Sequence, residues 1–505
     1  MIRPASMMQT ARRLAAVALV AAALAARSAR AQDAPLSPGA PRFRLFPEAV
    51  PPPSPKDPGG APAPKREKRF WMAAGELLGL EVMSWGFNRY VMDQGYAHIS
   101  WETVRNNLQA GFAFDDDKFT TNQIGHSYGG SFYFNASRSN GFTFWESTLF
   151  TAAGSAIWEI AAETQGPSLN DLVNTTFGGA VFGEASYRLS QMLLDDRARG
   201  GARVLRETAA ALLNPTQLIT RLTTGDLWAV RAERGDTLLP SGFVAEADGG
   251  WRHFVSSTRA NPDQALFTAA VRYGDPFDRY VSRPFDSFDL GVDVSWPSTA
   301  WLTRVEIRGL LAGWDLDPGS PGGRHVLGVF MDFDYTNNDT RVFSSQSFRF
   351  GLLSMRPLGK GVELRTEALG VVAPLVALQN DHPDSSNGTV GRAYDYGPGA
   401  AVFTAIRLRR RELDLLTLTY SLFWTHTSNG VARNSSIQSF RAETRLPIAG
   451  SLSAGGSWSW GKRISTYDAF DTIRVDATQW RVFVSCMFRY AGPAGRFFAR
   501  RPFFR

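Results

Sequence analysis

Two polar side chains near the C-terminal end of the sequence have types and a spacing suited to nucleophilic chemistry. His426 and Ser428 lie two residues apart in the run His426-Thr427-Ser428-Asn429-Gly430. Successive side chains of a β-strand point to opposite faces, so residues two apart share one face. A histidine beside a serine can accept its proton and activate the hydroxyl oxygen for attack on an ester. We therefore consider His426 a candidate general base and Ser428 a candidate nucleophile.

The same run resembles the His-x-Ser-Asn-Gly motif of outer-membrane phospholipase A and is similar to the His-x-Ser-Asn of the lipid A deacylase barrels. The resemblance implies that backbone amides next to Ser428 form the oxyanion site. In both families a third residue, an amide or a carboxylate on the next strand, orients the histidine. Counting as in those enzymes reaches Phe440, which cannot do this, whereas Gln438 shares the parity of His426 and is our predicted substitute. The alternative is an interfacial histidine above Trp424, followed by an ordinary turn.

A second group of polar residues could bind a metal ion. Glu159 and Glu163 are spaced to share one face of a helix, and His126 could complete the set of ligands. The chain has only 6 histidines and no His-x-x-x-His pair. The alternative, which we prefer, is that these groups hydrogen-bond each other and hold helices in register. The sequence therefore predicts no metal ion and no other cofactor.

A denser pattern surrounds His126. Its residues are Asp115-Asp116-Asp117, Phe119, Thr121-Asn122-Gln123, Gly130-Ser131, Trp145-Glu146, Trp158-Glu159, Pro167-Ser168, Asn170-Asp171, Gly178-Gly179, Gly183-Glu184 and Arg188-Leu189-Ser190. Together they resemble the bacterial domain-of-unknown-function family 3943 over about residues 85–200. Ser127 departs from the family, which often has proline after the histidine. The family name implies no activity, so the resemblance indicates where a domain lies rather than what it does.

The N-terminus predicts export from the cytoplasm. Arg12 and Arg13 precede an apolar run at residues 14–26, and Ala29-Arg30-Ala31 then supplies small residues. This layout is typical of a secretory signal peptide, here residues 1–31. The apolar run is shorter than the roughly 18 residues that a membrane-spanning helix needs. Residues 32–68 are proline-rich and predict an extended linker.

The rest of the chain predicts an α+β architecture in two parts. Residues 69–225 are expected to form a helical domain, either periplasmic or plugging a barrel. From Phe243 the hydrophobic period changes to two, as where Trp480, Val482 and Val484 share one parity and Arg481, Ser485 and Arg489 share the other. An apolar face opposed by mixed charge is typical of a transmembrane antiparallel β-barrel, expected at residues 226–492. A soluble β-sandwich is the competing fold. Residues 493–505 form a basic tail.

The strand count and the connections indicate a topology. About twelve strands are expected, an even number as in bacterial barrels. Short connections at 356–360, 409–411 and 447–450 alternate with longer loops at 373–397, 427–434 and 464–477. Short turns lie on the periplasmic side of such barrels, so both ends of this barrel should be periplasmic. The first strands follow the alternation less well.

Composition narrows the function. The net charge of +7 is dispersed along the chain, which argues against a nucleic-acid partner. The single cysteine excludes an intrachain disulfide. We predict a Gram-negative outer-membrane protein whose partners are membrane lipids and, during insertion, the barrel-assembly machinery. The preferred function is non-enzymatic, in envelope structure or passage of small solutes. The alternative is hydrolysis of outer-leaflet acyl chains by His426 and Ser428. The substrate and the oligomeric state are left open.

Overall fold

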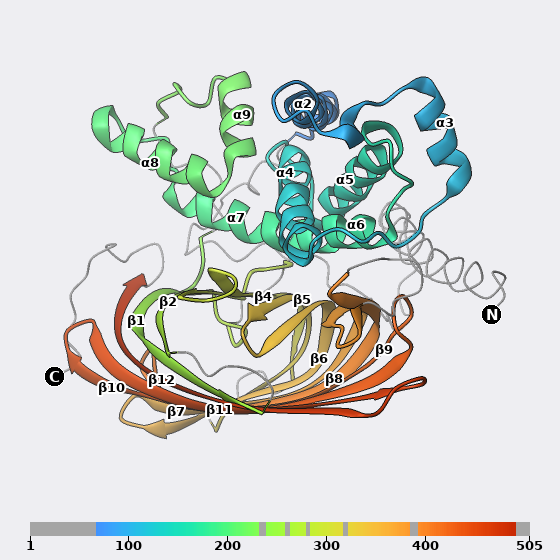
Figure 1. Cartoon of the computed structure of the whole chain (residues 1–505). Coiled ribbons are helices and arrows are strands. Elements are labelled where there is room, and N and C mark those ends of the chain that lie inside the picture. Colours follow the sequence, from blue (N-terminus) through green and yellow to red (C-terminus); the bar gives the residue numbers. More distant parts are fainter. Residues whose placement is uncertain are drawn as a thin grey trace, which may run out of the picture. The chain divides into compact units, whose positions relative to one another are not determined.

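The computed structural model describes residues 67–231, 239–257, 263–278, 283–316, 322–383 and 392–490. The predicted signal peptide, nearly all of the linker and the basic tail lie outside these residues. By its contacts the chain divides into two compact units. One contains the helices, and the other contains all the strands together with residues 116–124 (Figure 1). Each unit is described by itself.

The helical unit confirms the helical prediction between residues 70 and 223. Short π-helical turns at Trp158–Ala162 and Asn174–Gly178 lead out of one helix and into another. The α-helices are α2 (Phe70–Tyr90), α3 (Trp101–Ala110), α4 (His126–Arg138), α5 (Phe144–Ile157), α6 (Leu169–Val173), α7 (Gly179–Leu193), α8 (Gly200–Leu213) and α9 (Pro215–Thr223).

Local sequence explains where several helices begin. Ser100 and Thr143 each accept a hydrogen bond from the third residue of the following helix, and the side chain of that residue bonds back. This reciprocal capping satisfies backbone N–H groups that have no partner within the helix. Helix α9 begins with Pro215, whose fixed backbone angle suits a first helical position, and Asn214 caps it. These helix starts are therefore encoded locally.

The packing of α4 against α7 depends on two glycines and one ion cluster. A Cβ on Gly130 would lie 2.1 Å from the carbonyl oxygen of Thr175, and one on Gly179 would lie 2.6 Å from the backbone of Gly130. Only glycine permits this approach of the two backbones. Glu184 of α7 is fully buried, with carboxylate oxygens 2.7 Å from Arg138 Nε and 2.8 Å from Arg188 Nε. Burial alone would raise the pKa of Glu184, but the two arginines hold it below its ordinary value.

The strands form a closed antiparallel barrel of twelve strands in sequence order, which confirms the predicted fold and excludes a sandwich. The last strand pairs with the first, beginning with Phe243 opposite Tyr490. The strands are β1 (Phe243–Ser256), β2 (Asp263–Tyr273), β3 (Phe288–Trp296), β4 (Leu302–Asp315), β5 (Arg324–Asn338), β6 (Arg341–Gly359), β7 (Val362–Gln379), β8 (Tyr394–Arg410), β9 (Leu413–His426), β10 (Arg433–Ala449), β11 (Leu452–Tyr467) and β12 (Ile473–Tyr490).

The connections agree with the predicted topology in the C-terminal half. Two-residue turns follow β6, β8 and β10 at the end of the barrel where β1 starts and β12 finishes. Positive φ angles at Lys360, Gly361, Arg411 and Gly450 produce these tight reversals. In the first half the alternation is absent, because the two-residue connection between β5 and β6 lies at the opposite end. A single asymmetry of loop length therefore does not hold around the whole barrel.

The two faces of β12 confirm the predicted alternation. Trp480, Val482 and Val484 are 53%, 56% and 53% exposed, whereas Arg481 and Ser485 are 5% and 0% exposed. Side chains of the first group therefore point away from the barrel, and those of the second point into it. Other exposed apolar side chains of the wall are Trp251, Phe267, Phe350, Leu352, Val402, Ile406, Leu416, Leu422 and Phe488.

Part of the outer wall is covered by the chain itself. Phe119, from residues 116–124, stacks on Tyr335 of β5 and meets Tyr394 of β8 edge-on. The Asn122 amide donates to the Tyr394 hydroxyl at 2.8 Å. Tyr394 shares its parity along β8 with exposed Val402, so this segment packs on the outside of the wall. Residues 116–124 therefore lie outside the barrel, because strand alternation directs these tyrosines outward. The placement of the helical domain, either periplasmic or plugging the barrel, stays a prediction.

The ion cluster of the helical unit yields a stability prediction. Glu184→Gln removes the carboxylate charge that pairs with both Arg138 and Arg188 and leaves these two buried guanidinium groups without it. We expect the free energy of unfolding of the helical unit to fall by about 3 kcal/mol. The measurement is thermal unfolding followed by the helical circular dichroism signal. Glu102→Gln, an exposed change in α3, is the control and should leave the transition unchanged. Equal transitions for both variants would contradict the prediction.

Candidate functional site

The structure places His426 on the outer face of the barrel rim, as predicted. It is the last residue of β9, it is exposed, and its ring stacks on that of Trp424 with centroids 6.4 Å apart. Its Nδ1 atom lies 3.1 Å from Oδ1 of Asn434. Asn434 is directly opposite His426 in the register of β9 and β10. An amide on the next strand therefore does orient this histidine.

Among the described residues, neither of the other two predicted members of the site, Ser428 and Gln438, forms a hydrogen bond with His426. The backbone N–H of Ser428 donates to the carbonyl of Tyr396. Gln438 is paired with Leu422, four residues along β10 from Asn434, which is about 13 Å in an extended strand. Gln438 therefore cannot orient His426, and its prediction is corrected to Asn434.

The loop that follows His426 has a structural explanation. Arg392 donates to the carbonyl oxygen of Asn429 at 3.0 Å, and Tyr396 N–H donates to the same oxygen. Gly430 has a φ of 123°, and a Cβ there would lie 1.9 Å from a carboxylate oxygen of Asp395. Asn429 and Gly430 thus serve a tight turn against β8. This agrees with the interpretation of an interfacial histidine followed by a turn.

The barrel encloses a second candidate site, a cavity of about 800 Å³. Charged side chains from nearly all the strands line it, and thirteen of them are arginines, ten are carboxylates and none is a lysine. Several pairs join distant strands: Arg445 of β10 lies 2.8 Å from Glu246 and 2.9 Å from Asp248 of β1. Arg308 of β4 similarly lies 3.0 Å from Glu367 of β7. The cavity is therefore polar, and its walls are tied together by ion pairs.

Arg341 differs from most of the arginines that line the cavity. It is the first residue of β6, and its guanidinium donates to Ser439 Oγ at 3.0 Å. Among the residues that the structure describes, no carboxylate forms an ion pair with Arg341. Its positive charge is therefore available to a solute in the cavity.

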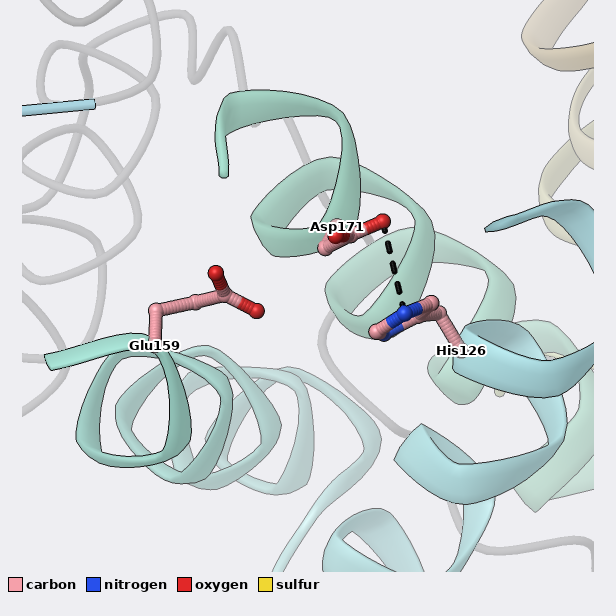
Figure 2. Close-up of side chains that lie close together, drawn as sticks. All are labelled: His126, Glu159 and Asp171. Atoms are coloured by element: carbon pink, nitrogen blue, oxygen red, sulfur yellow. Dashed lines mark ion pairs between the residues drawn. The ribbon is translucent and has the colours of Figure 1, made fainter. Parts of the chain in front are cut away.

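The helical unit contains a third cluster, and this one overlaps the predicted metal ligands. His126, Glu159 and Asp171 each offer one donor atom, and these atoms lie within 4.8 Å of one another. They come from α4, the π-helical turn at Trp158–Ala162 and α6, and in Figure 2 the carboxylate of Glu159 points toward the other two side chains. His126 Nε2 lies 3.5 Å from Asp171 Oδ1. Asp171 was missed in the sequence because helical spacing cannot relate separate helices.

Glu163, the third residue of the predicted metal group, lies in another environment. Its carboxylate accepts a hydrogen bond of 2.5 Å from the indole N–H of Trp158. Burial lowers the pKa of His126 to about 4, and this outweighs the opposite influence of Asp115. Burial, followed by the nearby carboxylates of Asp115 and Glu159, raises the pKa of Asp171. The cluster therefore combines a neutral imidazole with crowded acidic groups.

Comparison with known protein families finds a match for one part of the chain. Residues 111–216 match the family described as domain of unknown function (DUF3943). This confirms the resemblance seen in the sequence, over a span that includes the His126 cluster. No match to a curated protein was found.

Solved structures resemble the barrel. KdgM porin has 9% identity, with 47% of this chain and 98% of that chain covered and a TM-score of 0.20. An outer membrane channel from Pseudomonas putida F1 has 8% identity, covering 51% and 100%, with a TM-score of 0.25. OpdQ of Pseudomonas aeruginosa has 8% identity, covering 49% and 97%, with a TM-score of 0.19. At these identities the likeness concerns the β-barrel fold. No described helix is long and apolar enough to cross a membrane.

The rim geometry yields a prediction about lipid hydrolysis. Since no base among the described residues forms a hydrogen bond with the Ser428 hydroxyl, we expect purified wild-type protein and Ser428→Ala to release fatty acid from phospholipid vesicles at the same background rate. The measurement is fatty-acid release over time, with His426→Ala as a second variant. Release that disappears in both variants would restore the hydrolase hypothesis.

Proposed function

We propose that this protein is an outer-membrane β-barrel that passes small hydrated solutes, with a preference for anions. The observation that carries the proposal is the cavity of about 800 Å³ inside the barrel, lined by charged side chains. A small barrel is filled by its own side chains, whereas this barrel of twelve strands leaves an open cavity between them. Here the interior is polar, and it can exchange its water for a solute.

The outer surface supports insertion in the outer membrane. Exposed tryptophan, valine, leucine and phenylalanine side chains cover much of the wall, including Trp480 and Val482 of β12. The strands contain from 9 to 19 residues, and about 9–11 residues suffice to cross a bilayer. Closure leaves no strand edge without a partner in the wall. Export by residues 1–31 and insertion by the barrel-assembly machinery are parts of the same proposal.

The charges set the size and the sign of the expected solute. Ion pairs such as Arg445 of β10 with Asp248 of β1 join side chains of the cavity lining and leave less room in the cavity for a solute. Arginines outnumber carboxylates in the lining, and Arg341 has no ion pair with a described carboxylate. A cavity with an excess of one sign attracts ions of the other sign. Small anions are therefore the favoured solutes.

Ion conductance of the wild-type protein and of the Arg341→Glu variant tests this proposal. We expect wild-type protein in planar bilayers to open channels with an anion preference in a salt gradient. The substitution replaces an unpaired positive charge in the cavity by a negative one, so the anion-to-cation permeability ratio should fall by about twofold or more. The reversal potential measures this ratio.

The control is Arg356→Glu, which makes the same charge change at an exposed arginine of β6 outside the cavity lining. It should leave the permeability ratio at the wild-type value. A wild-type protein that inserts, shows heat-modifiable migration of a folded barrel and yet conducts no ions would refute the passage role. An equal shift in both variants would refute the contribution of Arg341.

A further inference from the structure

We infer that His126, Glu159 and Asp171 bind a divalent transition-metal ion in the helical unit, through one imidazole nitrogen and two carboxylates. The inference is independent of the proposed passage role, because these three residues belong to the helical unit alone. It also departs from the expectation drawn from the sequence, in which the polar groups only hydrogen-bond each other.

The distances suit a metal ion better than they suit direct hydrogen bonds. His126 Nε2 and Asp171 Oδ1 are 3.5 Å apart, longer than the usual 2.7–3.2 Å of a hydrogen bond. Two ligand atoms of a tetrahedral zinc ion, each about 2.0–2.1 Å from the metal, are about 3.3 Å apart. All three donor atoms lie within 4.8 Å of one another, so a small movement of Glu159 completes the set.

Neighbouring groups already orient each ligand. The backbone N–H of Ser168 donates to Glu159 Oε2 at 2.7 Å. Thr175 Oγ1 lies 3.4 Å from Nδ1 of His126, on the opposite side of the ring from the nitrogen that faces Asp171. Metal ligands in proteins are typically held by such outer partners, which fix the ring and the carboxylates before the ion binds.

The charge of the cluster calls for a cation. Within the described residues the only ion-pair partner of Asp171 is His126, and neither lysine nor arginine pairs with it. The Asn170 amide donates to both Asp115 at 2.7 Å and Asp171 at 3.0 Å, so a further carboxylate is held close. Glu184, in the same unit, is buried beside two arginines instead. A divalent ion would supply a positive charge beside Asp171, which has no lysine or arginine partner among the described residues.

The donor set indicates the class of ion. Carboxylates alone suit calcium and magnesium, whereas an imidazole ligand favours zinc and its transition-metal neighbours. A single histidine with two carboxylates therefore fits Zn²⁺, which we use as the probe. The helical unit places the three ligands on separate segments, so binding would also tie α4, α6 and the turn after α5 together.

The test measures zinc binding by the full chain in detergent, without a histidine tag and after treatment with a chelator. We expect one Zn²⁺ per chain by elemental analysis, with a dissociation constant measured by calorimetric titration. His126→Gln and Asp171→Asn should weaken binding at least about tenfold. His253→Gln is the control, since His253 also lies beside an aspartate, at 2.7 Å, but outside this cluster. It should bind zinc as the wild type does.

Three results would overturn the inference. The first is a wild-type chain that binds no stoichiometric zinc, and the second is unchanged affinity in both ligand variants. The third is binding of Mg²⁺ or Ca²⁺ as tight as that of Zn²⁺, since an imidazole ligand would then have no role. If the variants do not fold, the wild-type protein alone tests the site. Zinc should then raise its unfolding temperature, measured by the helical circular dichroism signal, and an unchanged temperature would refute the site.

Discussion

Closure of the barrel is the constraint on which the strand unit depends. The pairing of β12 with β1 removes the two edges that a twelve-stranded sheet would otherwise expose. In a bilayer an unpaired backbone edge would lose its hydrogen bonds with no water to replace them. Closure also gives the sheet an inside and an outside, and strand alternation then assigns every side chain to one of them. The apolar wall and the charged cavity both follow from this assignment.

Buried charges in both units are paired with charges of opposite sign to different extents, and these differences support the functional arguments. Inside the barrel, residues far apart in sequence become partners, as Arg445 and Asp248 do, while Arg341 remains without a described carboxylate. In the helical unit Glu184 has two arginines, whereas the ion-pair partner of Asp171 among the described residues is a histidine. Unbalanced charge is costly unless a solute or ion supplies the opposite sign. The unbalanced positions are therefore the ones to which we assign ligands.

The sequence predicted the positions of site residues that depend on neighbours in the same strand or helix, but not those that depend on contacts between segments. The outward position of His426 follows from alternation along a single strand, and it was predicted correctly. Its partner was not, because Asn434 is placed by the register between β9 and β10. Likewise, Glu159 and Glu163 were expected to share a helical face. The helical turn ends at Ala162 and Glu163 is extended, so the spacing argument no longer applies there.

By itself the sequence determined the period of most segments, and therefore the helical unit, the strand unit and the two faces of strands such as β12. These properties depend on neighbours a few residues apart, which the hydrophobic pattern records directly. Only the tertiary structure decided the pairing register, the covering of the outer wall by Phe119 and the meeting of His126 with Asp171. Each of these depends on segments distant in the chain, whose approach is set by packing and closure rather than by local spacing.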